Sequence, residues 1–189
     1  MDHRSSHGSS GAERLPIVAV IGSGNNAHEA LAEGLGPMLA SVGVHLICGG
    51  GGGVMASVSR AFYLTRPRRG SVIGVLPSIE NDRQCHPKEG YPNDWVEFPI
   101  ATHLFRSGRQ GCDPLSRNHI IILSSDAVIA LPGGDGTRSE ISLALRYQRP
   151  ILAYFEEGET VDKLPACVQL ARDQKDVKRF LFENLRMSR

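Results

Sequence analysis

Several common signatures are absent from this chain of 189 residues. No apolar run approaches the ~18 residues that span a bilayer, so no membrane-spanning helix is expected. The cysteines form no C-x-x-C pair and no Cys/His set with zinc spacing, and no metal site is predicted. We interpret all four as reduced thiols of a cytoplasmic protein: Cys48, Cys85, Cys112 and Cys167.

Lysine is scarce, and its positions exclude two functions. The only lysines are Lys88, Lys163, Lys175 and Lys178, and none stands in a glycine-rich turn. Pyridoxal phosphate needs a Schiff-base lysine, so chemistry with that group is rejected. The G-x-x-x-x-G-K-[ST] motif of ATP-hydrolysing P-loops is also missing. No organic cofactor is predicted.

A large excess of charge is missing too. The formal net charge is +1, so bulk electrostatics requires neither nucleic acid nor an anionic membrane as partner. Arg66, Arg68 and Arg69 cluster before an expected strand, and we interpret them as a solvated loop rather than a nucleic-acid site. Residues 1–14 are rich in Ser, His and Gly without an apolar segment, which predicts a disordered tail before one domain at 15–189.

Apolar runs alternate with helical periodicity along the rest of the chain. This alternation predicts an α/β fold, a Rossmann-like doubly wound parallel sheet in a single domain. Polar residues 79–94 have no period and are expected to form a long loop. The expected strands are 17–21, 44–48, 71–76, 95–99, 127–131 and 151–155, and the expected helices end near 41, 64, 124, 148, 173 and 185.

Two helix starts carry capping signals. Asn26 and Glu29 have capping-box spacing before the first helix. Asp113 followed by Pro114 predicts the start of the helix that ends near Ser124. A further helix is expected over 161–173.

Three glycine turns each follow an expected strand: Gly22-Ser23-Gly24, Gly49–Gly53 and Gly133–Gly136. They therefore meet at the carboxyl edge of the sheet, where such folds bind ligands, and we expect a phosphorylated small molecule there. Gly22 to Ala27 fits the G-x-G-x-x-A form of the dinucleotide fingerprint. No acid follows the second strand to hold a ribose, so NAD is not expected.

The stretch Pro132–Glu140 contains the strongest chemical signal. Its glycines expose backbone at the start of a helix, whose unpaired N–H groups and dipole attract anions. Thr137 adds a hydroxyl donor, and Glu140 lies three residues further on the same helix face. The alternative is a tight turn followed by a glutamate that complements the helix dipole.

The same stretch resembles the P-G-G-x-G-T-x-x-E motif of the LOG family, the cytokinin-activating phosphoribohydrolases once labelled lysine decarboxylase-like. Gly49–Met55 is similar to the family's G-G-x-x-G-[VL]-M motif, and Arg117-Asn118 stands where LOG enzymes carry Arg-Lys. The likeness covers about residues 16–155. It implies a Rossmann-like fold, a homodimer, and cleavage of nucleoside 5′-monophosphates into free base and ribose 5-phosphate.

The resemblance also implies roles for individual residues. Glu140 would be the catalytic carboxylate and Arg117 its partner. A carboxylate suits this chemistry because N-glycosidic cleavage passes through an oxocarbenium-like state that it can stabilise. The 5′-phosphate would be held by Gly133, Gly134, Gly136 and Thr137, and the remaining ligand contacts are expected from Gly22, Ser23, Gly24, Gly50, Gly51, Gly53 and Asn118.

Three departures from the LOG pattern favour an alternative. Asn118 replaces a lysine, Asp135 places a carboxylate in the phosphate turn, and Arg138-Ser139 replaces the usual Leu-Glu. The pattern also resembles the molybdenum cofactor carrier proteins, which hold a pterin phosphate in this fold without chemistry. A non-catalytic carrier of such a ligand, or of a nucleotide, therefore remains open.

Two other pairs of side chains could reach the site. Arg106 and Arg109 precede Arg117 in a loop on the expected side, but we interpret them as surface charges. Tyr91 and Trp95 flank the end of the long loop and could stack on a base, although packing against the sheet edge is the expected role.

Overall fold

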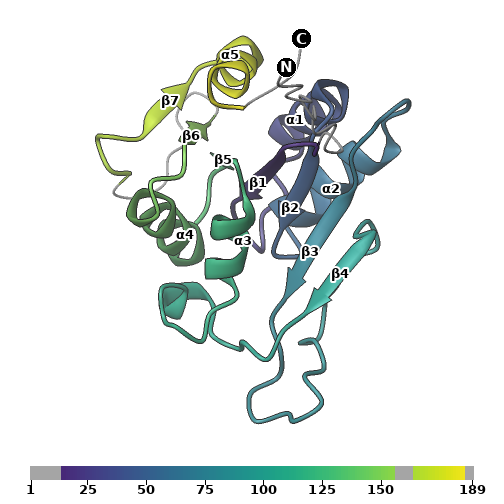
Figure 1. Cartoon of the computed structure of the whole chain (residues 1–189), viewed down its shortest axis with the longest axis vertical. Helices are drawn as coiled ribbons and strands as arrows, with labels where there is room; N and C mark the ends of the chain where they lie inside the picture. Colours follow the sequence, from purple (N-terminus) through teal and green to yellow (C-terminus); the bar gives the residue numbers. More distant parts are fainter. Residues whose placement is uncertain (1–13, 156–163, 186–189) are drawn as a thin grey trace, which may run out of the picture.

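The computed structural model describes residues 14–155 and 164–185, which form one seven-stranded sheet with helices on both faces (Figure 1). The strands are β1 (Ile17–Ile21), β2 (His45–Cys48), β3 (Val72–Leu76), β4 (Phe98–Ala101), β5 (Ala127–Ala130), β6 (Ile151–Tyr154) and β7 (Gln169–Ala171). The helices are α1 (Glu29–Val42), α2 (Val54–Leu64), α3 (Asn118–Ser124), α4 (Asp135–Arg146) and α5 (Gln174–Asn184), with a short 3₁₀ turn η1 (Gly108–Gln110).

The sheet order is β4-β3-β2-β1-β5-β6-β7, and every neighbouring pair is parallel. This arrangement confirms the predicted doubly wound α/β fold. The chain builds outward from β1 to β4 and then returns to the other side of β1 with β5. The boundary between β1 and β5 is therefore the point where the direction of winding reverses, and such points leave a crevice at the carboxyl ends of the strands.

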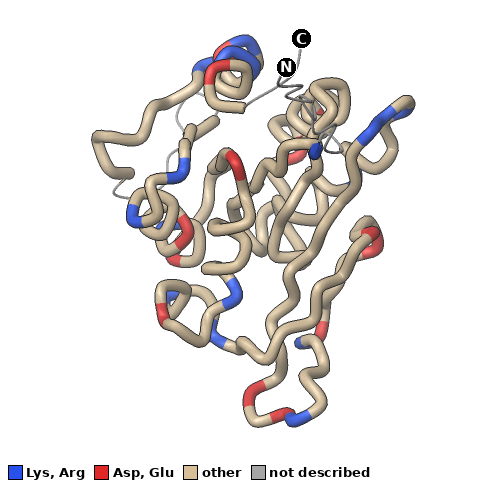
Figure 2. Tube along the Cα trace, viewed as in Figure 1, with Lys and Arg blue, Asp and Glu red and all other residues tan. Residues whose placement is uncertain are grey.

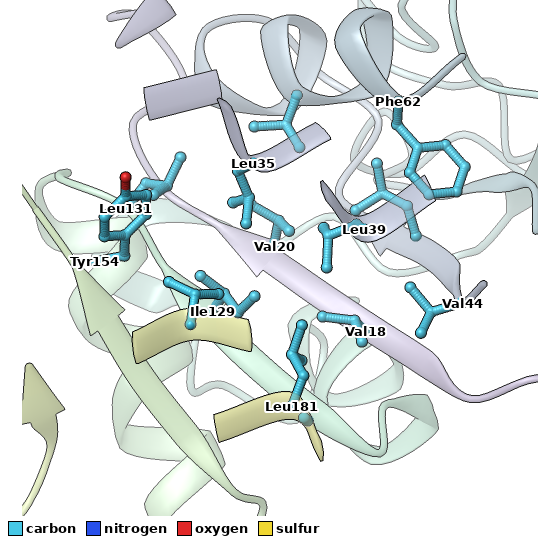
Figure 3. Close-up of a cluster of buried hydrophobic side chains, with 14 of the residues drawn as sticks. Val18, Val20, Leu35, Leu39, Val44, Phe62, Ile129, Leu131, Tyr154 and Leu181 are labelled. Carbon is cyan, nitrogen blue, oxygen red and sulfur yellow. The ribbon is translucent and has the colours of Figure 1, made fainter. Parts of the chain in front are cut away.

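Alternation along the buried strands creates two apolar layers. Val18 and Val20 of β1 pack with α1, α2 and α5 on one face, and Figure 3 shows the side chains at the centre of this layer. Ala19 and Ile21 point to the other face, where they pack with α3 and α4. Burial on both faces explains why the central strands are continuous β-branched runs rather than alternating ones.

Several elements agree with the sequence-based boundaries. β1 begins and ends at the predicted residues, α2 ends at the predicted residue, and β2, β3, β5 and β6 lie within one residue of the predicted strands. Residues 79–94 form the expected long loop, with one isolated bridge from Ser78 to Pro87. No helix among the described residues is long and apolar enough to cross a membrane.

One strand prediction and one helix prediction were wrong. β4 covers Phe98–Ala101 instead of 95–99, because the amides of Trp95 and Val96 donate to Asn93 in a turn before the strand begins. The helix expected over 161–173 is contradicted at its described residues, where Gln169–Ala171 pairs with β6 as an edge strand. Residues 161–163 of that prediction, and residues 1–13 of the predicted tail, lie outside the described part of the chain.

Both capping predictions also need correction. Before α1, His28 takes the N-cap position and makes no side-chain cap hydrogen bond, while the Ser23 hydroxyl accepts from the amides of Asn25 and Asn26. Asp113 accepts from the amide of Leu115 in a separate turn, and α3 begins only at Asn118. In both places a local side-chain turn competes with the helix start.

Candidate functional site

The three glycine turns meet at the carboxyl edge of the sheet, as predicted. The Ser23 amide donates to the carbonyl of Pro132 at 3.0 Å, which joins the turn after β1 to the turn after β5. The Ser23 carbonyl accepts from the amide of Val54 at 2.9 Å, which joins it to the turn after β2. Ser23 therefore holds all three turns in one unit by its backbone.

Glycine is required where these turns touch. A Cβ on Gly133 would lie 2.8 Å from the Ser23 nitrogen, and a Cβ on Gly53 would lie 2.6 Å from the Gly24 carbonyl carbon. Gly53 also has φ +58°, a conformation that other residues adopt at a cost. These two glycines allow close packing of backbone against backbone.

The joined turns enclose a cavity of about 280 Å³. Nine of the predicted site residues line it: Gly22, Ser23, Gly24, Arg117, Asn118, Gly134, Gly136, Thr137 and Glu140. Four others, Gly50, Gly51, Gly53 and Gly133, lie behind the lining and pack against neighbouring turns and side chains. The structure thus separates the predicted set into residues that face the cavity and residues that shape it.

The start of α4 forms one end of the cavity. Gly134 is the N-cap, so the first amides of α4 and the positive end of its dipole face this space. The Thr137 side chain is buried, and its hydroxyl oxygen has no hydrogen-bond partner among the described residues. A buried hydroxyl without a partner beside open helix amides is a suitable place for an anion.

Asp135 does not leave an unpaired carboxylate in this turn. One of its oxygens accepts from Arg109 Nε at 2.5 Å, and the other accepts from Arg138. Arg109 stands on η1, and the Ser139 hydroxyl also donates to the carbonyl of Gly108 at 3.0 Å. These contacts fasten η1 to α4, and η1 thereby contributes a wall of the cavity.

Arg117 and Glu140 form a buried pair at the cavity. Arg117 Nη1 lies 3.8 Å from Glu140 Oε1 and also donates to the side-chain oxygen of Asn118. Both side chains of the ion pair are almost fully buried, with relative exposures of 6% and 11%. Arg117 Nε has no partner among the described residues, so this guanidinium retains an unused donor.

Gly49 makes room for this arginine. A Cβ on Gly49 would lie 2.7 Å from the guanidinium carbon of Arg117 and 2.9 Å from the sulfur of Met55. The glycine turn after β2 therefore contributes to the site by leaving space for the Arg117 guanidinium. Ligand contacts were predicted for Gly50, Gly51 and Gly53 but not for Gly49.

The electrostatic state of Glu140 is unusual. Burial raises the pKa of Glu140 from 4.5 to about 7, and the Arg117 guanidinium opposes this shift. The side chain therefore exchanges its proton near neutral pH, as the acids and bases of active sites often do. Because it lines the cavity, that proton is available to a bound molecule.

Eight lining residues were missed or given another role by the sequence, among them Val20 and Ile21 at the end of β1 and Asp135 at the start of α4. Ser107 and Gly108 lie in a segment without recognisable periodicity, and Asn25 and Met55 belong to two of the glycine motifs but were given no ligand contact. Tyr91 lines the cavity from the long loop, although the sequence favoured packing at the sheet edge.

The other charged candidates lie outside this cavity. Arg106 contacts Gln110 at 2.9 Å, and its guanidinium lies over the ring of Phe105. Arg68 forms an ion pair with Glu97 at 2.7 Å, in the turn between α2 and β3. Figure 2 shows this basic turn at the opposite end of the molecule from the loop 79–94. Within residues 14–155 and 164–185, no group of His, Cys, Asp and Glu is arranged to hold a metal ion.

Together these features define a Rossmann-like protein with an exposed helix start and a buried carboxylate–arginine pair beside a cavity at the switch point of its sheet. The chain belongs to the SLOG cluster4 family, whose sequence profile matches residues 15–179. This membership confirms the predicted relation to LOG proteins.

Individual relatives extend the comparison. An uncharacterised protein from Archaeoglobus fulgidus is 34% identical over 135 residues, which cover 70% of this chain and 76% of that protein. The molybdenum cofactor binding protein from Rippkaea orientalis is 27% identical with a TM-score of 0.68, over 91% of this chain and 98% of the other. The molybdenum cofactor carrier protein from Chlamydomonas reinhardtii is 27% identical with a TM-score of 0.65, over 89% and 99% of the two chains.

Proposed function

We propose that this protein binds a nucleoside 5′-monophosphate and hydrolyses its N-glycosidic bond, releasing the free base and ribose 5-phosphate. The observation that carries the proposal is the buried Glu140, which has a pKa of about 7 and faces the cavity beside Arg117. A helix N-terminus with a partnerless threonine hydroxyl supports the phosphate part of the proposal.

Each glycine turn has its own role in the proposed binding of the ligand. Gly134, Gly136 and Thr137 bind the 5′-phosphate through amides and a hydroxyl. Gly133 lies behind them and keeps the turn close to Ser23. From the adjoining turn, Gly22, Ser23 and Gly24 border the ligand, while Gly50, Gly51 and Gly53 shape the turn that supports it.

The chemistry follows from the charge that develops at the sugar. As the bond from C1′ to the base nitrogen breaks, positive charge spreads over C1′ and the ring oxygen. The ionised Glu140 stabilises this charge and aligns a water molecule, whose oxygen bonds to C1′ while its proton leaves with the base. Arg117 holds ligand oxygens with its free Nε, and Asn118 keeps the guanidinium in place.

Incubation with AMP tests this proposal, with adenine and ribose 5-phosphate measured by liquid chromatography and mass spectrometry. We expect release by the wild type and a loss of at least about 100-fold in Glu140→Gln, because the variant cannot carry the stabilising charge. Glu183→Gln, an equal charge change at an exposed position of α5, is the matched control and should keep full activity. No release by the wild type, or equal release by Glu140→Gln, would reject the hydrolase.

A carrier of a phosphorylated pterin, such as molybdenum cofactor, is the second candidate. It is favoured by the 27% identity to a molybdenum cofactor binding protein and to a carrier protein over about nine-tenths of this chain. The anion seat would then hold the pterin phosphate, and Glu140 and Arg117 would bind it without breaking a bond. Native mass spectrometry of gently purified protein should reveal a retained ligand, whereas turnover of AMP would argue against this role.

We also infer a cytoplasmic homodimer. The cytoplasmic location is supported by four free cysteines, of which Cys112 and Cys167 are exposed. The dimer is supported by the common dimerisation of LOG proteins and by exposed apolar side chains at the edge strand β4. There, Phe98 is 59% and Ile100 43% exposed. Light scattering coupled to gel filtration should give twice the mass of the 20.5 kDa chain, and the mass of a single chain would contradict the dimer.

A further inference from the structure

The long loop 79–94 is fastened to the site at its carboxyl end. The Asn93 amide donates to the carbonyl of Gly50 at 2.8 Å, and the Asn93 side chain donates to the carbonyl of Gly51 at 2.9 Å. Asn93 also accepts from the amide of Trp95 at 3.1 Å. The loop is therefore tied directly to the glycine turn that follows β2.

Hydrogen bonds from Lys88 hold the loop to the segments before and after it. The amide of Lys88 donates to the carbonyl of Pro77 at 3.0 Å, and its ammonium donates to the carbonyl of Phe105 at 2.7 Å. Nearer the tip, the carboxylate of Asp82 accepts from the amides of Gln84 and His86. A loop with this many internal contacts presents its side chains in defined positions.

Tyr91 is the side chain that this loop brings to the cavity. A Cβ on Gly51 would lie 2.7 Å from Cε1 of Tyr91 and 2.9 Å from its hydroxyl oxygen. The ring thus lies directly on the backbone of the glycine turn and is only partly buried, with the cavity beside it. Among the described residues that line the cavity, Tyr91 is the only aromatic one.

The cavity has a polar end and a less polar end. The amides and hydroxyl at the start of α4 follow β5, whereas Tyr91 and Met55 border the turn after β2. β5 and β2 flank β1 on opposite sides, so their ends lie about 10 Å apart. A molecule with phosphate at one end and a flat ring at the other matches this order of groups, and Glu140 lines the same cavity.

We propose that Tyr91 stacks on the planar heteroaromatic ring of the ligand and that the loop 79–94 thereby sets ring selectivity at the site. The inference rests on the proposed function, because it takes the ligand to be a phosphorylated heterocycle. The aromatic face offers stacking to any flat nitrogen heterocycle, purines more than pyrimidines. The phosphate seat gives no such selectivity, since its donors contact only the anion.

Ligands that differ only in the ring provide the test. Dissociation constants for AMP, CMP and ribose 5-phosphate are measured by calorimetry in Glu140→Gln protein, so that the nucleotides stay intact. Adding Tyr91→Ala should weaken AMP binding about 10-fold, CMP binding less, and ribose 5-phosphate binding by under twofold. Tyr91→Phe should retain AMP binding, because the ring remains, and it controls for the loss of the hydroxyl.

Each other outcome has a defined meaning. Equal weakening of AMP and ribose 5-phosphate by Tyr91→Ala would assign the tyrosine a purely structural role and overturn the inference. AMP that binds no more tightly than ribose 5-phosphate to Glu140→Gln protein would overturn it as well. Tyr91-dependent binding of AMP without cleavage by the wild type would support the inference while rejecting the hydrolase, so the two failures can be told apart.

Discussion

Ionising Glu140 costs free energy, because its buried carboxyl group is more stable in the neutral form. Its pKa rises from 4.5 to about 7 because burial removes water, and the single arginine 3.8 Å away compensates only in part. The same burial serves the proposed role, because a carboxylate that water does not fully hydrate interacts more strongly with positive charge on the ligand.

The first prediction concerns stability and pH. Because the folded pKa of Glu140 lies above the unfolded value, its neutral form stabilises the fold below pH 4.5 and this contribution is lost as pH rises to about 7. Glu140→Gln does not titrate. The variant should match the wild type near pH 4.5 and become more stable at pH 8, by up to about 3 kcal/mol. Urea unfolding at both pH values measures this, and Glu183→Gln should show no such divergence.

The second prediction concerns Thr137. Its hydroxyl is buried without a partner among the described residues, so Thr137→Val should leave the free energy of unfolding unchanged or slightly higher. The same change removes a donor to the proposed phosphate, and affinity for ribose 5-phosphate should fall about 10-fold. Thermal unfolding and calorimetry report the two effects separately. A variant that loses stability but keeps its affinity would show that the hydroxyl serves the fold.

At the level of elements, α3 depends on the turn after β2. The α3 N-cap is Arg117, whose guanidinium fills the space above Gly49. Two segments far apart in the sequence therefore determine one ion pair. The arrangement also explains why a position without a side chain matters to the electrostatics of Glu140.

Gly49→Ala gives the third prediction. The new methyl group would displace the guanidinium, which can move because it is the end of a flexible side chain, at a cost of about 1–3 kcal/mol. Without Arg117 nearby, the pKa of Glu140 should rise above about 7, and the increase of AMP cleavage with pH should shift to higher pH. Gly134→Ala, where a Cβ meets nothing within 4 Å, serves as the control for stability. An unchanged pH profile in Gly49→Ala would contradict this account.

Elements buried on both faces were predictable, and edge elements were not. A continuous apolar run predicts β1, and a glycine turn followed by helical periodicity predicts α2, so each segment fits only one type of element. β4 and β7 are exposed edges, so their short segments lack the pattern that burial imposes. The predicted helix over 161–173 failed because pairing with β6 outweighed a weak period.

The same distinction holds for the site. Gly134, Gly136, Thr137 and Glu140 are adjacent in sequence, so their motif could be identified directly. Tyr91 comes from a loop without a period, and only its hydrogen-bonded return to the turn after β2 places it in the cavity. Contacts that depend on tertiary placement have no local signal for sequence analysis to detect.

For the whole molecule, binding should add stability. With AMP at 100 times its dissociation constant, Glu140→Gln protein should gain about 2.7 kcal/mol. For a chain of this size that gain corresponds to a rise in Tm of roughly 5–10 °C. Differential scanning fluorimetry measures it, with adenosine as the control that lacks the phosphate. An equal shift with adenosine would mean that the start of α4 contributes nothing to affinity.

The boundary between β1 and β5 has one more consequence. Strands β1 to β4, from residues 17–101, form the first half of the sheet, and β5 to β7, from residues 127–171, form the second. The two halves meet only at the register from Val18–Ala127 to Ile21–Ala130. Tyr91 belongs to the first half, whereas Glu140 and Thr137 belong to the second. A ligand bound between these residues would connect the two halves of the sheet across the boundary between β1 and β5. Hydrogen exchange at the amides that join β1 to β5 should therefore slow more on binding than exchange within either half.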